Sequence, residues 1–372
     1  MNKNTFCVVP YLGGCLTTTG KVKACCQSAD TPEYGYKDVV QWFTSDQMNK
    51  FREDLYKGVE HPWCKRCWDA QHLGQESLRE AYNHGLFDSE LKAIIQKSVA
   101  DGFSAGDIRF LSFEPGNLCN LKCAMCGPEN SSRILTEWKQ NKKWFSVAQY
   151  DKVDFSWPRH KEFDDVTKNI LPKLKYAKFA GGEPFLTPYV DKILEALPAD
   201  CLVHVATNLT VLDDRKIELL QKFDKIWLSA SIDAVDDLYE VIRYPAKWPE
   251  VEKNIQILRD KLPNALFNFS VTVSLLSILQ IDKTLNTLPG DIGIIAVDEP
   301  NYMSLNAIPD KWMPKITERI NNIKDPELRD YATQLLSQRK FSETDWQDCQ
   351  TFIERISSIR NITIDMQHLV DS

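Results

Sequence analysis

The sequence predicts an α/β protein built as an open, partial (β/α)6 barrel, with a small cysteine-rich N-terminal module and C-terminal helices. Two observations predict this fold. Six apolar, strand-like runs alternate with amphipathic segments of helical pattern between residues 107 and 300, and such alternation is typical of parallel sheets with right-handed crossovers. Six of the eleven cysteines fall within the first 85 residues, which sets that segment apart from the predicted barrel.

The expected strands are the apolar runs at 108–115, 176–184, 202–208, 225–233, 266–274 and 291–297. Helical patterns lie between them, near 129–141, 188–197, 213–222, 247–262 and 277–287. Six strand–helix units are fewer than the eight of a closed barrel, so we expect an open one. In such sheets the chemistry gathers at the carboxyl ends of the strands, which makes the residues after each strand candidate site residues.

Four segments are expected along the chain. Residues 1–85 would form the cysteine-rich module, 86–106 a linker helix, 107–300 the barrel and 301–372 a helical extension. Within the first segment, short strands and turns are expected, with a hairpin around Gly20. Residues 311–360 have a helical pattern and are expected to pack over one edge of the barrel.

Composition and charge exclude several classes of protein. The chain has 372 residues, of which 43% are hydrophobic and 26% charged, values typical of globular proteins. A net charge of -7 and a pI near 5.5 argue against a nucleic-acid partner, because phosphate binding needs a basic face. No run of 18 apolar residues predicts a membrane span, and the start of the chain lacks the pattern of a secretory signal. We therefore expect a cytoplasmic protein.

Three cysteines lie in the stretch "CNLKCAMC" after the first barrel strand: Cys119, Cys123 and Cys126. An odd number of cysteines in tight groups, without a secretory signal, favours metal or redox chemistry over disulfides. A cubane iron–sulfur cluster has four irons, each of which takes one outside ligand, so three cysteines leave one iron open. Structural thiols, or a zinc site completed by a distant residue, remain alternatives.

The pattern C-x3-C-x2-C after the first strand, with "GGEP" after the second, resembles the radical S-adenosylmethionine (SAM) superfamily over about residues 107–300. The resemblance implies an enzyme whose [4Fe–4S] cluster, held by the three cysteines, binds SAM at the open iron. In that family one electron cleaves SAM, and the 5′-deoxyadenosyl radical abstracts hydrogen from a substrate. An external electron donor such as flavodoxin or ferredoxin is implied as well.

The resemblance also implies a set of SAM-binding residues. The glycines of "GGE" let the backbone come close to a ligand, and Glu183 can accept hydrogen bonds from the SAM ammonium. The residue before the third cysteine is usually aromatic in the family, whereas here it is a methionine, which can also pack on adenine. The alternatives are an ordinary turn, strand-end caps and a surface arginine. The implied residues are Met125, Gly181, Gly182, Glu183, Asn208, Ser231, Asp233 and Arg243.

A second cysteine set lies in the first 85 residues. The run C-x12-G-x4-C, followed by "CKRC", is similar to the opening of the SPASM and twitch modules of radical SAM enzymes, although those modules usually follow the barrel. The similarity implies one auxiliary [4Fe–4S] cluster. Structural zinc suits four cysteines as well, and Cys26 could replace its neighbour as a ligand. The expected ligands are Cys7, Cys25, Cys64 and Cys67.

The expected substrate is a peptide or protein side chain, because SPASM and twitch modules often accompany that role. The aromatic and basic insertion 138–161 could form a lid or substrate wall, or it could be a packed amphipathic segment. One alternative is an enzyme that modifies a nucleotide, RNA or small sugar-like molecule. A non-enzyme alternative is an iron–sulfur or zinc scaffold protein, against which the "GGE" turn argues, since a scaffold needs no SAM site.

Overall fold

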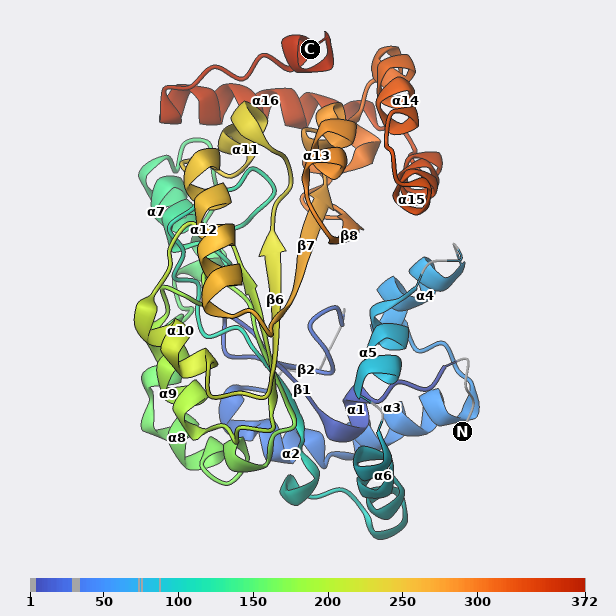
Figure 1. The fold of residues 1–372 in the computed structure, drawn as a ribbon, viewed down its shortest axis with the longest axis vertical. Coiled ribbons are helices and arrows are strands. Elements are labelled where there is room, and N and C mark those ends of the chain that lie inside the picture. Colours follow the sequence, from blue (N-terminus) through green and yellow to red (C-terminus); the bar gives the residue numbers. More distant parts are fainter. Residues whose placement is uncertain (1–4, 29–33, 73, 75, 87, 372) are drawn as a thin grey trace. The chain divides into compact units, whose positions relative to one another are not determined.

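Eight strands form one sheet in the order β2-β1-β3-β4-β5-β6-β7-β8 (Figure 1). The structure, a computed structural model, describes residues 5–28, 34–72, 74, 76–86 and 88–371. The first two strands pair antiparallel. The pairs β1–β3, β3–β4, β4–β5 and β7–β8 are parallel. The strands are β1 (Gly13–Leu16), β2 (Val22–Lys23), β3 (Phe110–Phe113), β4 (Tyr176–Phe179), β5 (Leu202–Thr207), β6 (Lys225–Ser231), β7 (Leu266–Val273) and β8 (Asp291–Ala296).

The six strands expected from the sequence are β3 to β8, so the predicted α/β fold with a partial barrel is confirmed. The hairpin expected around Gly20 is also present, since β1 pairs with β2 and Gly20 takes a φ of +76°. The sheet gains these two strands from the N-terminal segment, which the sequence had suggested would be a separate module. The expected domain boundaries stay a prediction.

The chain divides into two compact units, which are described separately. The first consists of Met1–Leu118, Lys152–Ala206 and Asp213–Trp227. Its helices are α1 (Val9–Leu12), α2 (Val39–Phe43), α3 (Asp46–Lys57), α4 (Lys65–His72), α5 (Leu78–Leu86), α6 (Ser89–Asp101), α8 (Lys161–Thr167), α9 (Pro188–Ala196) and α10 (Asp214–Leu220). Side-chain caps define their ends: Ser45 accepts a hydrogen bond from the Met48 amide at the start of α3, and Gly58 ends that helix in the left-handed region.

Aromatic side chains on neighbouring strands build the core of the first unit. Phe110 of β3 stacks on Tyr176 of β4 with 5.0 Å between ring centroids, and Phe113 stacks on Phe179 three residues further along the same two strands. The pairs lie side by side because the two strands are in parallel register. This packing fixes the strand ends that precede the "GGEP" turn.

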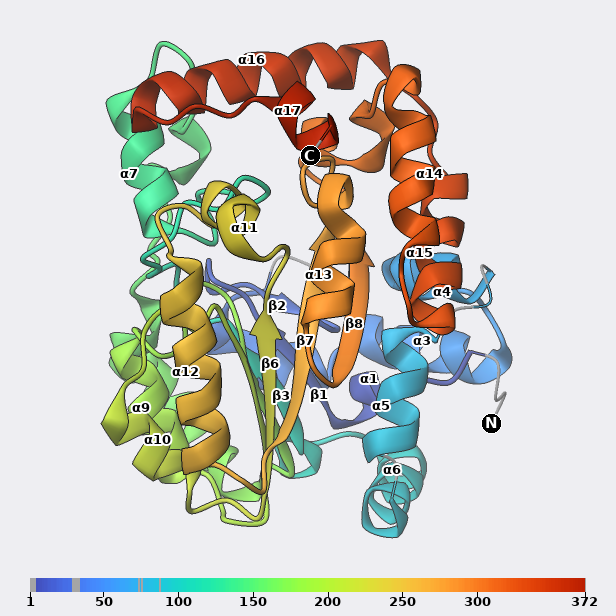
Figure 2. The ribbon, with the colours of Figure 1, turned by 45° about the horizontal axis from the view of Figure 1, so that its top comes forward.

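The second unit consists of Cys119–Asp151, Thr207–Leu212 and Leu228–Ser372. Its helices are α7 (Ser132–Gln140), α11 (Asp236–Ile242), α12 (Trp248–Lys261), α13 (Ile281–Thr287), α14 (Met313–Asn321), α15 (Pro326–Ser337), α16 (Glu343–Arg360) and α17 (Met366–Asp371). The predicted helical pattern over 311–360 is confirmed as α14 to α16, and α15 packs against the edge strand β8. Figure 2 shows the C-terminal end of α16 beside α7. Among the described residues, no helix has both the length and the hydrophobicity needed to cross a bilayer.

Candidate active site

The three cysteines of "CNLKCAMC" lie on one loop of the second unit, before α7. Cys119 is buried, and Cys123 and Cys126 are half-buried. Burial raises the pKa of the Cys126 thiol well above its usual value, and the neighbouring Cys123 and Cys119 raise it further. The thiols are therefore close enough to act on one another electrostatically. Binding of a metal centre would relieve this by displacing the thiol protons.

Asn208 lies against this loop. Its Nδ2 donates to Asn120 Oδ1 at 3.2 Å and lies 3.8 Å from Cys119 Sγ, while its Oδ1 accepts from the Thr210 amide. The sequence analysis suggested that Asn208 faces SAM. In the structure its side chain holds the first cysteine and the residue after it, which makes it a support for the loop.

A cavity of about 490 Å³ lies beside the cysteine loop in the second unit. This volume is within the range of small-molecule sites, about 300–1,000 Å³. Cys123, Cys126 and Met125 form one wall, as expected for residues at a cluster and its ligand. The other lining residues are Gly127, Pro128, Glu129, Asn130, Trp138, Gln149, Tyr150, Arg243, Thr272, Glu299, Pro300 and Tyr302.

Arg243 supplies a buried positive charge to this cavity. Its Nε lies 2.7 Å from Asp233 Oδ2, and the second Asp233 oxygen accepts from the Thr272 amide at 2.8 Å. Burial alone would lower the pKa of Arg243, but the Asp233 carboxylate raises it above the usual value. The resemblance to radical SAM enzymes implies both Asp233 and Arg243 as SAM-binding residues. In the structure they form a pair in which only Arg243 lines the cavity.

Ser231 is the last residue of β6 and is not among the residues that line the cavity. Its side chain is half-buried. Of the implied SAM-binding residues in this unit, Met125 and Arg243 line the cavity. Asp233 does not line it but pairs with Arg243.

The glycine–glycine–glutamate turn lies in the first unit, after β4. Gly181 and Gly182 have φ values of +66° and +43°, and a Cβ on Gly182 would lie 2.5 Å from the carbonyl oxygen of Leu118. The Glu183 amide donates to that same oxygen at 2.7 Å. The turn is therefore packed directly on Leu118, the residue that precedes Cys119 in the chain. A residue with a Cβ atom would not fit at position 182, so the turn requires glycine there.

Glu183 is almost fully buried, with 1% of its surface exposed. Its Oε1 accepts from the Phe185 amide at 3.0 Å, and its carbonyl oxygen accepts from the Thr187 hydroxyl. A buried carboxylate needs hydrogen-bond donors to compensate for its lost hydration. The turn provides one donor to Oε1, which fixes the orientation of the side chain.

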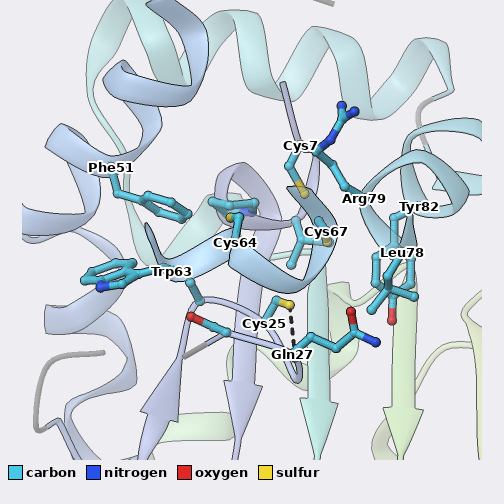
Figure 3. Close-up of a pocket in the computed structure, with 14 residues that line it drawn as sticks. Cys7, Cys25, Gln27, Phe51, Trp63, Cys64, Cys67, Leu78, Arg79 and Tyr82 are labelled. Atoms are coloured by element: carbon cyan, nitrogen blue, oxygen red, sulfur yellow. Dashed lines mark hydrogen bonds between the residues drawn. The ribbon is translucent and has the colours of Figure 1, made fainter. Parts of the chain in front are cut away.

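The four N-terminal cysteines expected to bind a cluster surround one small cavity of the first unit (Figure 3). Cys7 precedes α1 and Cys25 follows β2. Cys64 ends the turn before α4, and Cys67 lies in the first turn of α4. The cavity measures about 20 Å³, which is room for one water molecule. Figure 3 also shows the hydrogen bond from the Gln27 amide to Cys25 Sγ, at 3.2 Å.

Burial makes these thiols hard to ionise in the absence of a metal. It raises the pKa of Cys7 to about 12, and Cys67 contributes to the same shift. Burial, with the neighbouring Cys7 and Cys67, likewise raises the pKa of Cys64. Over the described residues, no three Cys, His, Asp or Glu side chains are arranged as a ready-made site for a single metal ion.

Cys25 lines this cavity, whereas Cys26 is not among the lining residues. The Cys26 sulfur lies 3.9 Å from Lys178 Nζ on β4. A hydrogen bond from Cys25, together with the nearby Lys178 ammonium, lowers the pKa of Cys26 despite its burial. The two neighbouring thiols therefore have different surroundings, and the geometry favours Cys25 as the ligand.

Sequence reasoning missed a row of polar residues on one face of the sheet. Cys15, Ser112, Lys178 and His204 occupy paired positions on β1, β3, β4 and β5. Burial lowers the pKa of His204, so its ring is neutral, and Nδ1 lies 2.7 Å from the Tyr176 hydroxyl. The signal was present in the sequence, since each of these polar residues interrupts an otherwise apolar run.

Residues of the insertion 138–161 lie in two different surroundings. In the second unit, Trp138 and Tyr150 line the 490 Å³ cavity, and the Tyr150 hydroxyl donates to Glu129 at 2.6 Å. In the first unit, Trp157 is buried and stacks on Tyr36 with 5.0 Å between centroids. One half of the insertion is thus cavity wall, and the other half is core.

Comparison with known proteins gives one family. Residues 113–288 match the family model described as the Radical SAM superfamily. This segment runs from the end of β3 to just past α13, so the resemblance is confirmed for the part of the chain whose motifs carried it. The search of curated proteins found no match.

Several solved structures are similar in fold. The structure of anSMEcpe with bound AdoMet has 17% sequence identity to this chain and a TM-score of 0.42. The match covers 62% of this chain and 62% of the anSMEcpe chain. SuiB of Streptococcus suis bound to S-adenosylmethionine is 13% identical, covers 84% of this chain and 63% of its own, and has a TM-score of 0.34. The chain therefore spans less than two thirds of the length of these two proteins.

Proposed function

Because residues 113–288 match the radical SAM superfamily, we propose that the protein is a radical SAM enzyme. Cys119, Cys123 and Cys126 would hold a [4Fe–4S] cluster, with SAM in the 490 Å³ cavity beside them. When bound, the cluster supplies the electron that cleaves SAM and so starts hydrogen abstraction from a substrate. The observation that carries the proposal is a loop with three thiols, two of which, Cys123 and Cys126, line a cavity that contains a buried arginine.

The chain's own residues would bind and orient SAM. Arg243 can pair with the SAM carboxylate, because its guanidinium has more donors than the one directed at Asp233. Asp233 holds that guanidinium in place through its second bond to the Thr272 amide. Glu183 would accept from the SAM ammonium as a charged hydrogen-bond acceptor. Met125 would pack on the adenine, and Trp138 would exclude water from the cavity.

The test is the loss of iron and of SAM cleavage together. After anaerobic reconstitution, the variant with Cys119, Cys123 and Cys126 replaced by Ala should lose about four irons per chain. It should also release no 5′-deoxyadenosine from SAM and a chemical reductant. The matched control replaces Cys201 and Cys349, two buried cysteines outside both sets, by Ala. If the triple variant still makes 5′-deoxyadenosine, the assignment of this loop is wrong.

For the second cysteine set we propose an auxiliary [4Fe–4S] cluster on Cys7, Cys25, Cys64 and Cys67. The support is the convergence of these four side chains on one cavity (Figure 3). A four-iron cluster needs more space than 20 Å³, so the sulfur atoms would move apart on binding. The alternative occupant is a single zinc ion bound by four thiolates.

The proposed substrate is a peptide or protein side chain, on the resemblance of the N-terminal cysteines to SPASM and twitch modules. An external flavodoxin or ferredoxin would donate the electron. A nucleotide, an RNA or a small sugar-like substrate is the alternative among enzymes. Candidate substrates can be ranked by whether they raise the rate of 5′-deoxyadenosine release, and transfer of deuterium from a labelled peptide into 5′-deoxyadenosine would identify the substrate class.

A further inference from the structure

A buried group of three charges in the second unit lies outside the residues assigned above. Glu137 of α7 and Arg360, the last residue of α16, have side chains that are each only 2% exposed. Arg360 binds the carboxylate with two nitrogens, Nη2 at 2.8 Å from Oε1 and Nε at 3.2 Å from Oε2. Lys122 Nζ binds the same carboxylate at 2.7 Å from Oε2.

Lys122 is part of the cysteine loop, one residue before Cys123. Its amide donates to the carbonyl oxygen of Tyr244 at 2.7 Å, and the amide of Ala124 donates to that of Ile242 at 2.8 Å. Next to Cys123, the loop is therefore held by two backbone hydrogen bonds to the end of α11 and the residues after it, and by the Lys122 side chain on Glu137. The Lys122 side chain links the loop to Arg360 of α16 through Glu137.

The carboxylate is the centre of the group. Burial alone would raise the pKa of Glu137, but Arg360 and Lys122 hold it below the usual value. A buried carboxylate that lost one of two cations would be poorly compensated, and the remaining cation would move toward it. Lys122 and Arg360 thus share one carboxylate, and Arg360 lies 223 residues after Glu137 in the chain.

We propose that Arg360 is a positioning residue for the cysteine loop, acting through Glu137 on Lys122. The proposal rests on the function proposed for that loop as a cluster site. It gives α16 a role in the chemistry, because the helix would hold Cys123 in the place that cluster binding needs. The bidentate geometry matters, since a lysine at position 360 could supply charge but not two parallel hydrogen bonds.

The first measurement uses the cluster-free full chain and hydrogen exchange. In Lys122→Met, the amides of residues 122 and 124 should exchange about 10-fold faster or more, because a charge-assisted bond that restrains the loop is lost. Lys122 is only partly buried, with 21% of its side chain exposed, so the substitution should leave the fold intact. The control is Lys139→Met, the same chemical change at an exposed position of α7.

Arg360→Lys should give an increase at the same two amides, with Arg355→Lys as its control on α16, where Arg355 bonds to the carbonyl oxygen of Trp144. Exchange in β7, for example at Phe269, should not change in any variant. Equal exchange in Lys122→Met and Lys139→Met would overturn the proposal. An increase spread equally over β7 would also overturn it, because the charged group would then stabilise the whole unit rather than the loop.

A second measurement uses the reconstituted protein. Iron bound by the cysteine loop should be lost to a chelator about 10-fold faster in Lys122→Met than in Lys139→Met. If the unaltered protein holds no iron on this loop, the proposed function fails, while the exchange result on the cluster-free chain still decides the role of Arg360. If the unaltered protein holds iron and both variants lose it at one rate, the role of Arg360 is refuted and the proposed function stands.

Discussion

At the scale of single residues, Asp233 acts on the cavity through Arg243. Asp233 is fully buried and its two oxygens are used by the Thr272 amide and the Arg243 guanidinium. A ligand carboxylate in the cavity would therefore meet an arginine whose orientation is already set. Such preorganisation lowers the entropic cost of binding, because the side chain has few other positions to lose.

The first prediction concerns the stability of this pair. Asp233→Asn keeps the side-chain shape and an acceptor for the Thr272 amide, but it leaves Arg243 buried without a counter-charge. The free energy of unfolding should fall by about 3–5 kcal/mol. In Asp236→Asn, where the native carboxylate is 54% exposed and pairs with Lys283, the loss should be about 0–1 kcal/mol. Urea titration of both variants checks this, and similar losses would contradict the buried-pair argument.

The second prediction concerns Glu183. Glu183→Gln keeps an oxygen for the Phe185 amide but removes the charge proposed to bind the SAM ammonium. SAM affinity should fall about 10- to 150-fold, as expected for a charge-assisted bond of about 1.5–3 kcal/mol. Iron content should not change, because the glutamate is not a cluster ligand. Calorimetric titration with SAM is the measurement. Unchanged affinity would reduce "GGEP" to a structural turn.

At the scale of elements, the turn after β4 is defined by close packing as well as by backbone conformation. Gly182 has a positive φ and its hydrogen atoms face the backbone of Leu118. Gly102, which ends α6, also has a positive φ, of +91°, but a Cβ there would meet no atom within 4 Å. A substitution at Gly102 would therefore introduce only backbone strain. A substitution at Gly182 would introduce backbone strain and a clash with Leu118.

The third prediction uses that contrast. Gly102→Ala should cost about 1–3 kcal/mol of unfolding free energy, the cost of a positive-φ, extended backbone that only glycine adopts readily. Gly182→Ala should lose about 1–3 kcal/mol more, since a Cβ placed 2.5 Å from the Leu118 oxygen must displace the turn. SAM binding should weaken only in Gly182→Ala. Equal losses of stability in the two variants would show that the turn does not need its contact with Leu118.

The insertion 138–161 shows why an element's environment is harder to predict than its existence. Trp138 and Trp157 lie in the same aromatic and basic stretch, yet one lines a cavity and the other is core of a different unit. Local composition is the same at both, so it cannot separate them. What separates them is the partner that each ring meets, Tyr36 in the case of Trp157, and that partner lies 121 residues away in the sequence.

At the scale of the whole molecule, the sequence predicted the features that depend on residues close together in the chain. The apolar runs predicted β3 to β8, and cysteine spacing predicted which thiols would share a loop or a cavity. Two features depended on distant segments instead: β1 joins the sheet by pairing with β3, and Arg360 reaches Glu137 on α7. Neither leaves a periodic trace near its own position, so the sequence alone gave no means of finding them.

The fourth prediction concerns metal content. The reconstituted chain should hold about eight irons, in two four-iron clusters. Replacing Cys64 and Cys67 by Ala should remove about four of them. The variant should still cleave SAM when no substrate is present, because neither cysteine belongs to the loop of Cys119, Cys123 and Cys126. Replacing Cys26 by Ala is the control, since its thiol does not line the cavity. Native protein with one zinc and about four irons would contradict the auxiliary cluster.

The pairing of β1 with β3 has a consequence for biosynthesis. Gly13 pairs with Phe110. After β1 has been translated, about a hundred further residues must therefore be translated before its parallel neighbour β3 is available. At about 5–20 residues per second, the wait is about 5–20 s, during which the hairpin of β1 and β2 has an unpaired edge. Pairings of such long sequence separation fold slowly, and exposed edges invite association with other chains. The nascent chain should therefore depend on chaperones most strongly between the emergence of β2 and that of β3.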